Sequence, residues 1–117
     1  DPEVFWQIAS VSSGRSWAQQ TWYPVPGIID TAAANNNFEA TFRTDLARKD
    51  VGLALDAGES TGVRLPAATL AREHFDELIE QGLGDKDCSL IVKNLLPDGA
   101  VRGWSPEPAH ANQPAAG

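Results

Sequence analysis

Several residue types are scarce in this chain, and each scarcity excludes a class of protein. Cys88 is the one cysteine among 117 residues, so no disulfide can form within the chain. Basic residues are few: 9 Lys and Arg against 16 Asp and Glu leave a net charge of −7, which argues against nucleic acid as the main partner. No apolar run approaches the roughly 20 residues of a membrane span, and the first residues show no signal-peptide pattern.

Two kinds of binding site are also missing from the sequence. One Cys and two distant His leave no readable zinc site. The stretch Gly82-Leu83-Gly84 lacks a third glycine and a preceding strand, so it is not a dinucleotide-binding fingerprint. We therefore expect neither a metal site nor the main phosphate-binding turn of a dinucleotide site.

The beginning of the chain is typical of a helix start. Asp1 suits an N-cap, Pro2 the first helical position and Glu3 the acidic first turn. There is no methionine in the chain. We therefore expect a fragment that begins at a helix, with further sequence upstream.

The pattern of apolar residues predicts an all-α fold. Apolar residues make up 42% of the chain and recur at helical spacing, while no alternating strand pattern of useful length is present. We expect an irregular bundle of about five helices, in which Gly62 suits a left-handed cap. The expected helices cover residues 2–11, 16–22, 44–60, 66–81 and 85–96, and most of 28–41 is expected to be loop.

The composition changes at Pro97, beyond which prolines are interleaved with Ala, Gly, Asn and Ser. Such a segment has no periodic apolar pattern with which to build a core. We therefore expect residues 1–96 to form the helical domain. Residues 97–117 are expected to be a disordered tail, with Trp104 as the only large anchor.

A lysine interrupts an apolar stripe in the middle of the chain. Phe42, Leu46, Lys49 and Leu53 follow a spacing of four, three and four, which places them on one helical face. One interpretation is that the Lys49 ammonium extends to solvent or pairs with Asp45. The other is that the helix is central, because its opposite face is also apolar, and that Lys49 is buried for a purpose.

Four sequence blocks resemble the C-terminal domain of 3-hydroxyisobutyrate dehydrogenases, members of the β-hydroxyacid dehydrogenase family, over residues 1–96. Their order and spacings match the family's. The blocks are Ser12-Ser13-Gly14-Arg15 with Trp17, Pro24-Val25-Pro26-Gly27, Asn35-Asn36-Asn37 ahead of Phe42, and Lys49-Asp50. One position departs from the pattern: Trp22 stands where these enzymes usually carry a tyrosine, so a direct polar contact with substrate there is in doubt.

The resemblance implies a helical domain like that of 6-phosphogluconate dehydrogenase-like enzymes. It implies an NAD-dependent enzyme that oxidises 3-hydroxyisobutyrate to methylmalonate semialdehyde in valine degradation. Lys49 and Phe42 would contact NAD, and Trp17, Trp22 and Asp50 would line the substrate site. The family's general acid/base lysine and its NAD-binding turn would lie upstream, so no catalytic residue is expected in this chain.

The resemblance also implies a homo-oligomer that binds a small hydroxy acid and neither nucleic acid nor membrane. Its location would be the bacterial cytoplasm, or the mitochondrion in a eukaryote. Two other readings stay open at this point. The chain could belong to a related dehydrogenase of a different 2- or 3-hydroxy acid, or it could be a non-catalytic helical module whose apolar grooves bind a partner helix.

Other residues have ordinary structural interpretations. Trp17, Trp22 and Phe42 could simply fill a core, since aromatic side chains bury large areas anywhere. His74 is expected to be a core histidine, and Cys88 a small buried apolar residue. Lys86 is expected at an outer helix end, where its replacement by alanine would have little effect.

Overall fold

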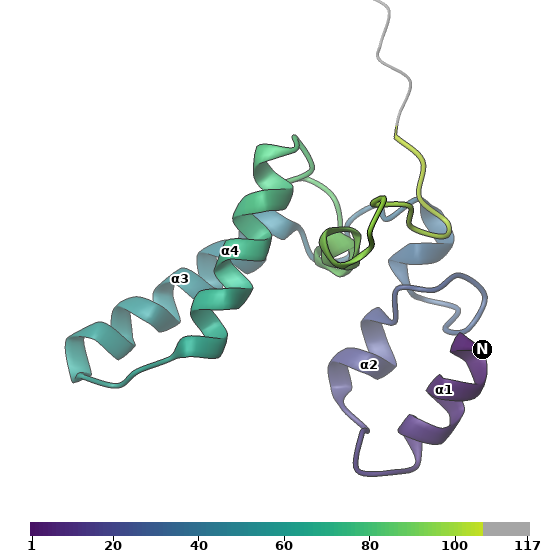
Figure 1. The fold of residues 1–117 in the computed structure, drawn as a ribbon, viewed down its shortest axis with the longest axis horizontal. Helices are drawn as coiled ribbons and strands as arrows, with labels where there is room; N and C mark the ends of the chain where they lie inside the picture. The colour runs from purple at the N-terminus through teal and green to yellow at the C-terminus, as the bar shows by residue number, and fades with distance from the viewer. Residues whose placement is uncertain (107–117) are drawn as a thin grey trace, which may run out of the picture.

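The computed structural model describes residues 1–106, which fold into helices joined by loops (Figure 1). The α-helices are α1 (Pro2–Ser10), α2 (Trp17–Trp22), α3 (Thr44–Thr61) and α4 (Pro66–Glu80). Two 3-10 segments, η1 (Ala33–Asn36) and η2 (Cys88–Leu95), lie before α3 and after α4. Apart from two isolated bridges, this part of the chain contains no strand pairing. The all-α class predicted from the sequence is confirmed.

Local sequence signals place the helix ends close to where they were predicted. The Asp1 carboxylate accepts the backbone N–H of Glu3 at 2.8 Å, and the Ser16 hydroxyl accepts that of Gln19 at 3.1 Å. Both are N-cap interactions that satisfy donors left free in the first turn. Gly62 follows α3 with φ +70°, the left-handed conformation that glycine adopts at little cost.

The helices pack as two pairs, α1 with α2 and α3 with α4, and the two pairs lie apart (Figure 1). The Tyr23 hydroxyl donates to the Pro2 carbonyl at 2.8 Å and ties α2 to the start of α1. Arg48 on α3 pairs with Asp76 on α4 at 2.7 Å. The radius of gyration is 16.8 Å, compared with about 13 Å for a compact domain of about 100 residues. This part of the chain is therefore more open than a tight bundle.

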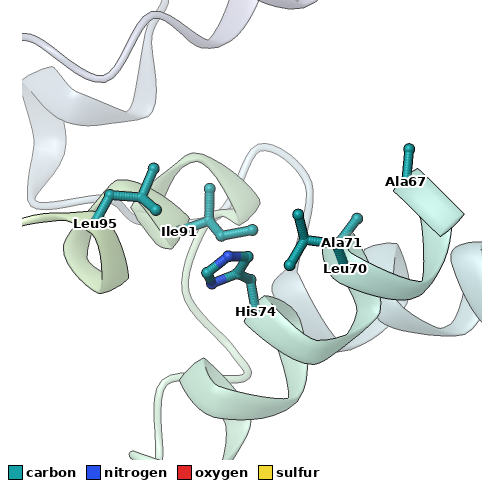
Figure 2. Close-up of a pocket in the computed structure, with 6 residues that line it drawn as sticks. All are labelled: Ala67, Leu70, Ala71, His74, Ile91 and Leu95. Atoms are coloured by element: carbon teal, nitrogen blue, oxygen red, sulfur yellow. The ribbon is translucent and has the colours of Figure 1, made fainter.

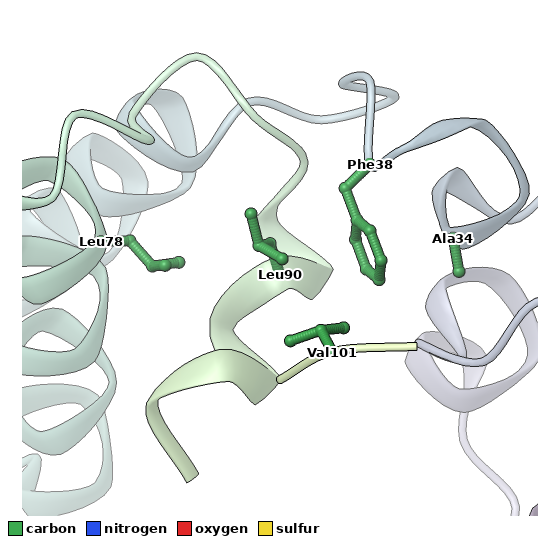
Figure 3. Packing of buried hydrophobic residues seen from close by; sticks show 5 residues of the cluster. All are labelled: Ala34, Phe38, Leu78, Leu90 and Val101. Carbon is green, nitrogen blue, oxygen red and sulfur yellow. The ribbon is translucent and has the colours of Figure 1, made fainter. Parts of the chain in front are cut away.

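One hydrophobic cluster connects the α3–α4 pair to the rest of the chain (Figure 3). Phe38, Leu78 and Leu90 are fully buried, so α4, η2 and the loop after η1 meet at this point. The other members of the cluster are Ala34 and Val101.

The start of the expected tail takes part in this core. Val101 is only 8% exposed, and Trp104 packs against the cluster. Asn37 receives a hydrogen bond from the Ser105 N–H and donates one to the Ser105 carbonyl, at 2.7 and 3.1 Å. The first residues of the expected tail therefore pack against the helical domain, because an apolar residue without periodicity can still fill a core. The domain boundary after residue 96 stays a prediction. Residues 107–117 of the predicted tail lie outside the described residues.

The last predicted helix is a 3-10 segment and not an α-helix. Its first turn is held by the Asp87 side chain, which accepts the Ser89 N–H, and by the Cys88 N–H, which donates to the Phe42 carbonyl at 2.8 Å. The hydrogen bond to the distant Phe42 holds the first turn in a position that differs from that of a regular α-helix. The periodicity of the apolar residues alone does not reveal this effect.

Helix α3 is covered on one side only. Ala47 is buried, whereas Leu46 is 44% and Leu53 is 60% exposed. The Lys49 side chain on the same open face is also 60% exposed. The interpretation of a central helix with a buried Lys49 is therefore wrong for this chain. Both faces are apolar in sequence, but residues 1–106 supply a covering helix, α4, for only one of them.

Candidate functional site

Three predicted site residues, Trp17, Trp22 and Phe42, form a continuous aromatic wall. The rings of Trp17 and Trp22 meet edge to face with centroids 4.9 Å apart. The rings of Trp22 and Phe42 stack at 6.0 Å with an interplanar angle of 19°. Trp17 is 68% exposed, and Trp22 and Phe42 are half-buried. Trp17 at one end of the row is therefore open to solvent, whereas Trp22 and Phe42 are partly covered.

The other two predicted site residues, Lys49 and Asp50, pair with each other on the open face of α3. Their charged atoms lie 3.3 Å apart, and both side chains are more than half exposed. Phe42 lies two residues before α3 begins at Thr44, so it does not share a helical face with Lys49 as its spacing predicted. The pairing of Lys49 with Asp45 does not form, because Asp45 binds Arg43 at 2.6 Å. That hydrogen bond with Arg43 lowers the pKa of Asp45.

The sequence did not identify the buried carboxylate of Asp87, which binds the backbone at Phe42 in the aromatic wall. Its Oδ1 accepts the backbone N–H groups of Thr41 and Phe42, at 2.8 and 3.0 Å, and the Thr41 hydroxyl at 2.8 Å. Its Oδ2 accepts the N–H and the hydroxyl of Ser89. A sequence signal was present, because aspartate is a favoured N-cap residue and Asp87 lies at the start of the last predicted helix. The start of that helix was predicted at residues 85–86, so Asp87 was not recognised as its N-cap.

Asp87 is fully buried, yet its hydrogen bonds keep it ionised. Burial by itself raises the pKa of a carboxyl group, but the bonds from Ser89, Phe42 and Thr41 outweigh burial and hold the pKa of Asp87 below its usual range. The carboxylate is therefore a permanent acceptor at neutral pH, which fixes the direction of every hydrogen bond that it receives.

The role expected for Lys86 is wrong. Its side chain is only 9% exposed and its Nζ lies 2.6 Å from the Glu39 carboxylate. Its carbonyl accepts both the N–H and the hydroxyl of Thr44 at 2.9 Å, at the start of α3. The Lys86 backbone therefore helps to attach α3 to the core, and we expect replacement of its side chain to be destabilising because the buried stem and the pair with Glu39 are lost.

Three further titratable residues have structural roles. Burial, followed by the charge of Asp87, raises the pKa of Cys88 to about 12, so the thiol stays protonated as expected for a buried apolar residue. Burial also raises the pKa of Tyr23. Since the Tyr23 hydroxyl bonds Pro2, it does not supply the hydroxyl that Trp22 lacks. His74 is half-buried, with Nδ1 3.8 Å from the Glu77 carboxylate.

Two apolar hollows flank η2. One, of about 450 Å³, lies between α2 and the α4–η2 region, and Trp22, Phe75 and Val92 are among its lining residues. The other, of about 390 Å³, runs between α4 and η2, where His74 and Leu70 face Ile91 (Figure 2). Ile91 and Leu95 line both hollows, so the apolar surface continues around η2. Across residues 1–106, no group of three or more metal-binding side chains comes together.

Comparison with known proteins identifies relatives over most of this chain. The sequence model of the family described as "NAD-binding of NADP-dependent 3-hydroxyisobutyrate dehydrogenase" matches residues 1–95. The mitochondrial 3-hydroxyisobutyrate dehydrogenase of Homo sapiens is 36% identical over 95 residues, which are 81% of this chain and 28% of the relative. An NAD-dependent L-serine dehydrogenase of Pseudomonas aeruginosa is 31% identical over 97 residues, which are 83% of this chain and 33% of the relative.

A solved structure shares the fold. The 3-hydroxyisobutyrate dehydrogenase of Mycobacterium tuberculosis, determined with L-serine, superposes with a TM-score of 0.76 at 33% identity. The match covers 81% of this chain and 32% of that enzyme. The chain thus spans about a third or less of the length of these relatives. No helix in the described part of the chain is long and apolar enough to cross a membrane.

Proposed function

Because the chain belongs to the 3-hydroxyisobutyrate dehydrogenase family, we propose that it is the C-terminal helical domain of an NAD-dependent 3-hydroxy acid dehydrogenase. The observation that carries the proposal is the aromatic wall of Trp17, Trp22 and Phe42, together with the solvent-exposed Lys49–Asp50 pair on α3. In the whole enzyme these residues would form one side of the cleft that holds substrate and dinucleotide.

The fold supports this position of the domain in the enzyme. A main dinucleotide-binding domain is built from parallel strands with a glycine-rich turn at a helix start. The elements of residues 1–106 are all helical, so we propose that this turn comes from another part of the enzyme. The family description nevertheless assigns NAD binding to this region. The helical fold and the family's NAD-binding description agree if this domain contacts a dinucleotide that is bound chiefly by an upstream domain.

The residues present fit one side of such a cofactor. The Lys49 ammonium is exposed and pairs with its neighbour Asp50 at 3.3 Å, a surface pair from which it can turn toward a phosphate or ribose oxygen. Phe42 offers a flat apolar face for the nicotinamide side, and its ring is fixed by stacking on Trp22. When bound, the dinucleotide supplies the hydride-accepting chemistry. The chain's own residues orient the reactants and exclude water from the cleft.

The proposed substrate is 3-hydroxyisobutyrate, and the product is methylmalonate semialdehyde, a step of valine degradation. The relatives named above act, by their names, on 3-hydroxyisobutyrate or on L-serine. Both are short carboxylic acids with a primary alcohol on carbon three, and they differ in a methyl or an ammonium group on carbon two. We propose 3-hydroxyisobutyrate because the family description and most of the relatives named above carry that substrate in their names. If the protein is eukaryotic, its relatives' names favour a mitochondrial location; if it is bacterial, we propose the cytoplasm.

The test is an assay of the full-length protein, following reduction of NAD and NADP, with 3-hydroxyisobutyrate, L-serine and a 2-hydroxy acid. We expect the highest kcat/KM for 3-hydroxyisobutyrate. The isolated 117-residue chain should show no activity and no tight NAD binding, because it lacks the phosphate-binding turn and the general acid/base lysine. Failure of the full-length protein to oxidise any hydroxy acid would leave the helical interaction module as the better interpretation.

We further propose that the isolated chain associates with itself. The apolar face of α1 is open, with Phe5 63% and Ile8 62% exposed, and so is that of α3 at Leu53. Exposed apolar patches of several hundred Å² usually find partners. Light scattering on the isolated chain should therefore show dimers or larger species, and a strict monomer at high concentration would contradict this. A Phe5→Ser variant should shift the equilibrium toward monomer.

A further inference from the structure

We propose that Asp87 is a positioning residue for the aromatic wall: its buried carboxylate holds Phe42 in place and, through the Thr41 hydroxyl, orients the Trp22 indole. The proposal rests on the proposed function in one respect, namely that the aromatic wall contacts substrate or dinucleotide. The positioning of Phe42 and Trp22 by Asp87 does not depend on that contact.

The first step is that Asp87 determines the path of the chain before α3. One carboxylate oxygen accepts three donors from two consecutive residues: the N–H and hydroxyl of Thr41, both at 2.8 Å, and the N–H of Phe42 at 3.0 Å. In the opposite direction, the Cys88 N–H donates to the Phe42 carbonyl at 2.8 Å. The backbone N–H of Phe42 is thus bound by Asp87 and its carbonyl by Cys88. These two bonds fix the position of the backbone from which the Phe42 ring projects.

The second step is that Asp87 itself is immobile. Its other carboxylate oxygen accepts the N–H and hydroxyl of Ser89, and its backbone N–H donates to the Phe38 carbonyl at 2.9 Å. Phe38 is fully buried in the hydrophobic cluster. Asp87 therefore connects the loop that carries the aromatic wall to the hydrophobic cluster, and this connection restricts the movement of the loop.

The third step concerns the direction of the Thr41 hydroxyl. Its single proton is directed to Asp87, because an ionised carboxylate can only accept. The hydroxyl oxygen therefore keeps its lone pairs for another donor, and the Trp22 Nε1–H points at it from 3.3 Å. The charge of Asp87 thus orients the indole, whose ring lies between those of Trp17 and Phe42.

The hydrogen-bond partners of this carboxylate distinguish positioning from general stabilisation. Thr41, Phe42 and Ser89 donate to the Asp87 side chain. Thr41 and Phe42 belong to the loop that carries the aromatic wall. By comparison, Asp76 on α4 binds Arg48 on α3 at 2.7 Å, away from that loop in the sequence. Asp76 is therefore the matched control: a carboxylate that stabilises the fold and positions no aromatic ring.

The experiment uses four variants of the full-length protein, Asp87→Asn, Thr41→Val, Thr41→Ser and Asp76→Asn. Near-UV circular dichroism measures the tryptophan environment, since the rings of Trp17 and Trp22 lie close enough to couple. A Trp22→Phe variant identifies the part of the spectrum that comes from this pair. Steady-state kinetics give KM and kcat for the hydroxy acid separately.

Thr41→Val removes two hydrogen bonds of the hydroxyl, the one to Asp87 and the one from Trp22. We expect it to change the Trp22 part of the spectrum and to raise KM roughly two- to tenfold with kcat largely retained, because the bond that reaches the aromatic wall is the neutral one from Trp22. Thr41→Ser keeps the hydroxyl and should restore both. Asp87→Asn should change the same part of the spectrum and lower kcat/KM about ten- to a hundredfold, as for a hydrogen-bonded charge. Asp76→Asn should leave the spectrum and KM unchanged.

An unchanged tryptophan spectrum in Thr41→Val overturns the proposal, and so does an equal effect of Asp76→Asn and Asp87→Asn. If Asp87→Asn does not fold, the Thr41 pair decides, because Thr41 is exposed and both substitutions conserve its size closely. If the wild-type protein oxidises no hydroxy acid, the proposed function fails while the spectra still decide whether Asp87 positions the wall.

Discussion

Replacing Lys49 with alanine in the full-length enzyme is expected to lower kcat/KM by about ten- to a hundredfold and to leave the melting temperature unchanged. If Lys49 contacts the dinucleotide, the change removes a charge-assisted hydrogen bond of roughly 1.5–3 kcal/mol. Little stability is lost, because the side chain is 60% exposed and its pair with Asp50 is on the surface. Steady-state kinetics and melting curves of the same preparations measure both quantities.

Companion variants sharpen this result. Asp50→Ala should also impair turnover, since Asp50 orients Lys49 at 3.3 Å. Lys49→Arg should not rescue fully, because a planar guanidinium does not replace a compact ammonium in a narrow cleft. Arg64→Ala is the control: it removes one exposed positive charge just beyond α3, at the end far from Lys49. Near-normal kinetics for Lys49→Ala would favour the interpretation in which Lys49 is only a solvated surface residue.

Leu78→Ala is expected to lower the free energy of unfolding by about 2–5 kcal/mol, a large part of the roughly 5–15 kcal/mol of a typical domain. Leu78 is fully buried, with a relative accessibility of 0%, and it lies in the hydrophobic cluster with Phe38 and Leu90 (Figure 3). Removal of its side chain leaves a cavity where α4 meets η2. Chemical denaturation of the isolated chain, followed by far-UV circular dichroism, measures the loss.

The matched control lies on the same helix. Leu70 is 56% exposed, so Leu70→Ala removes the same atoms and makes the same change in helix propensity without opening a core cavity. We expect its effect to stay within about 0.5 kcal/mol. Equal losses for the two variants would show that the cluster around Leu78 does not hold α4 in place.

Much of the local structure could be predicted because its causes are local. Asp1, Ser16 and Gly62 act through caps, each within a few residues of the group that it satisfies. The predicted and observed limits of α3 and α4 differ by one residue at most. The 3-10 form of η2 was not predictable in this way, since its start is tied to Phe42, which lies far away in sequence.

The candidate site was predictable in its members but not in their arrangement. Trp17, Trp22 and Phe42 were named from sequence motifs, and the structure brings their rings together. The sequence left open whether Lys49 is solvated or buried, because whether a helix face is covered depends on which other elements reach it. Asp87 was missed because its partners, Thr41 and Phe42, are more than forty residues away and leave no periodic trace.

The sequence by itself determined the all-α class, the helix ends and the family of this protein, because capping, helical periodicity and ordered motifs are properties of short segments. The tertiary structure alone decided that Asp87 and Lys86 are buried, that Val101 joins the core, and that one face of α3 stays open. These outcomes depend on contacts between distant segments. A pattern along the chain shows which side chains share a face, whereas only packing shows what that face meets.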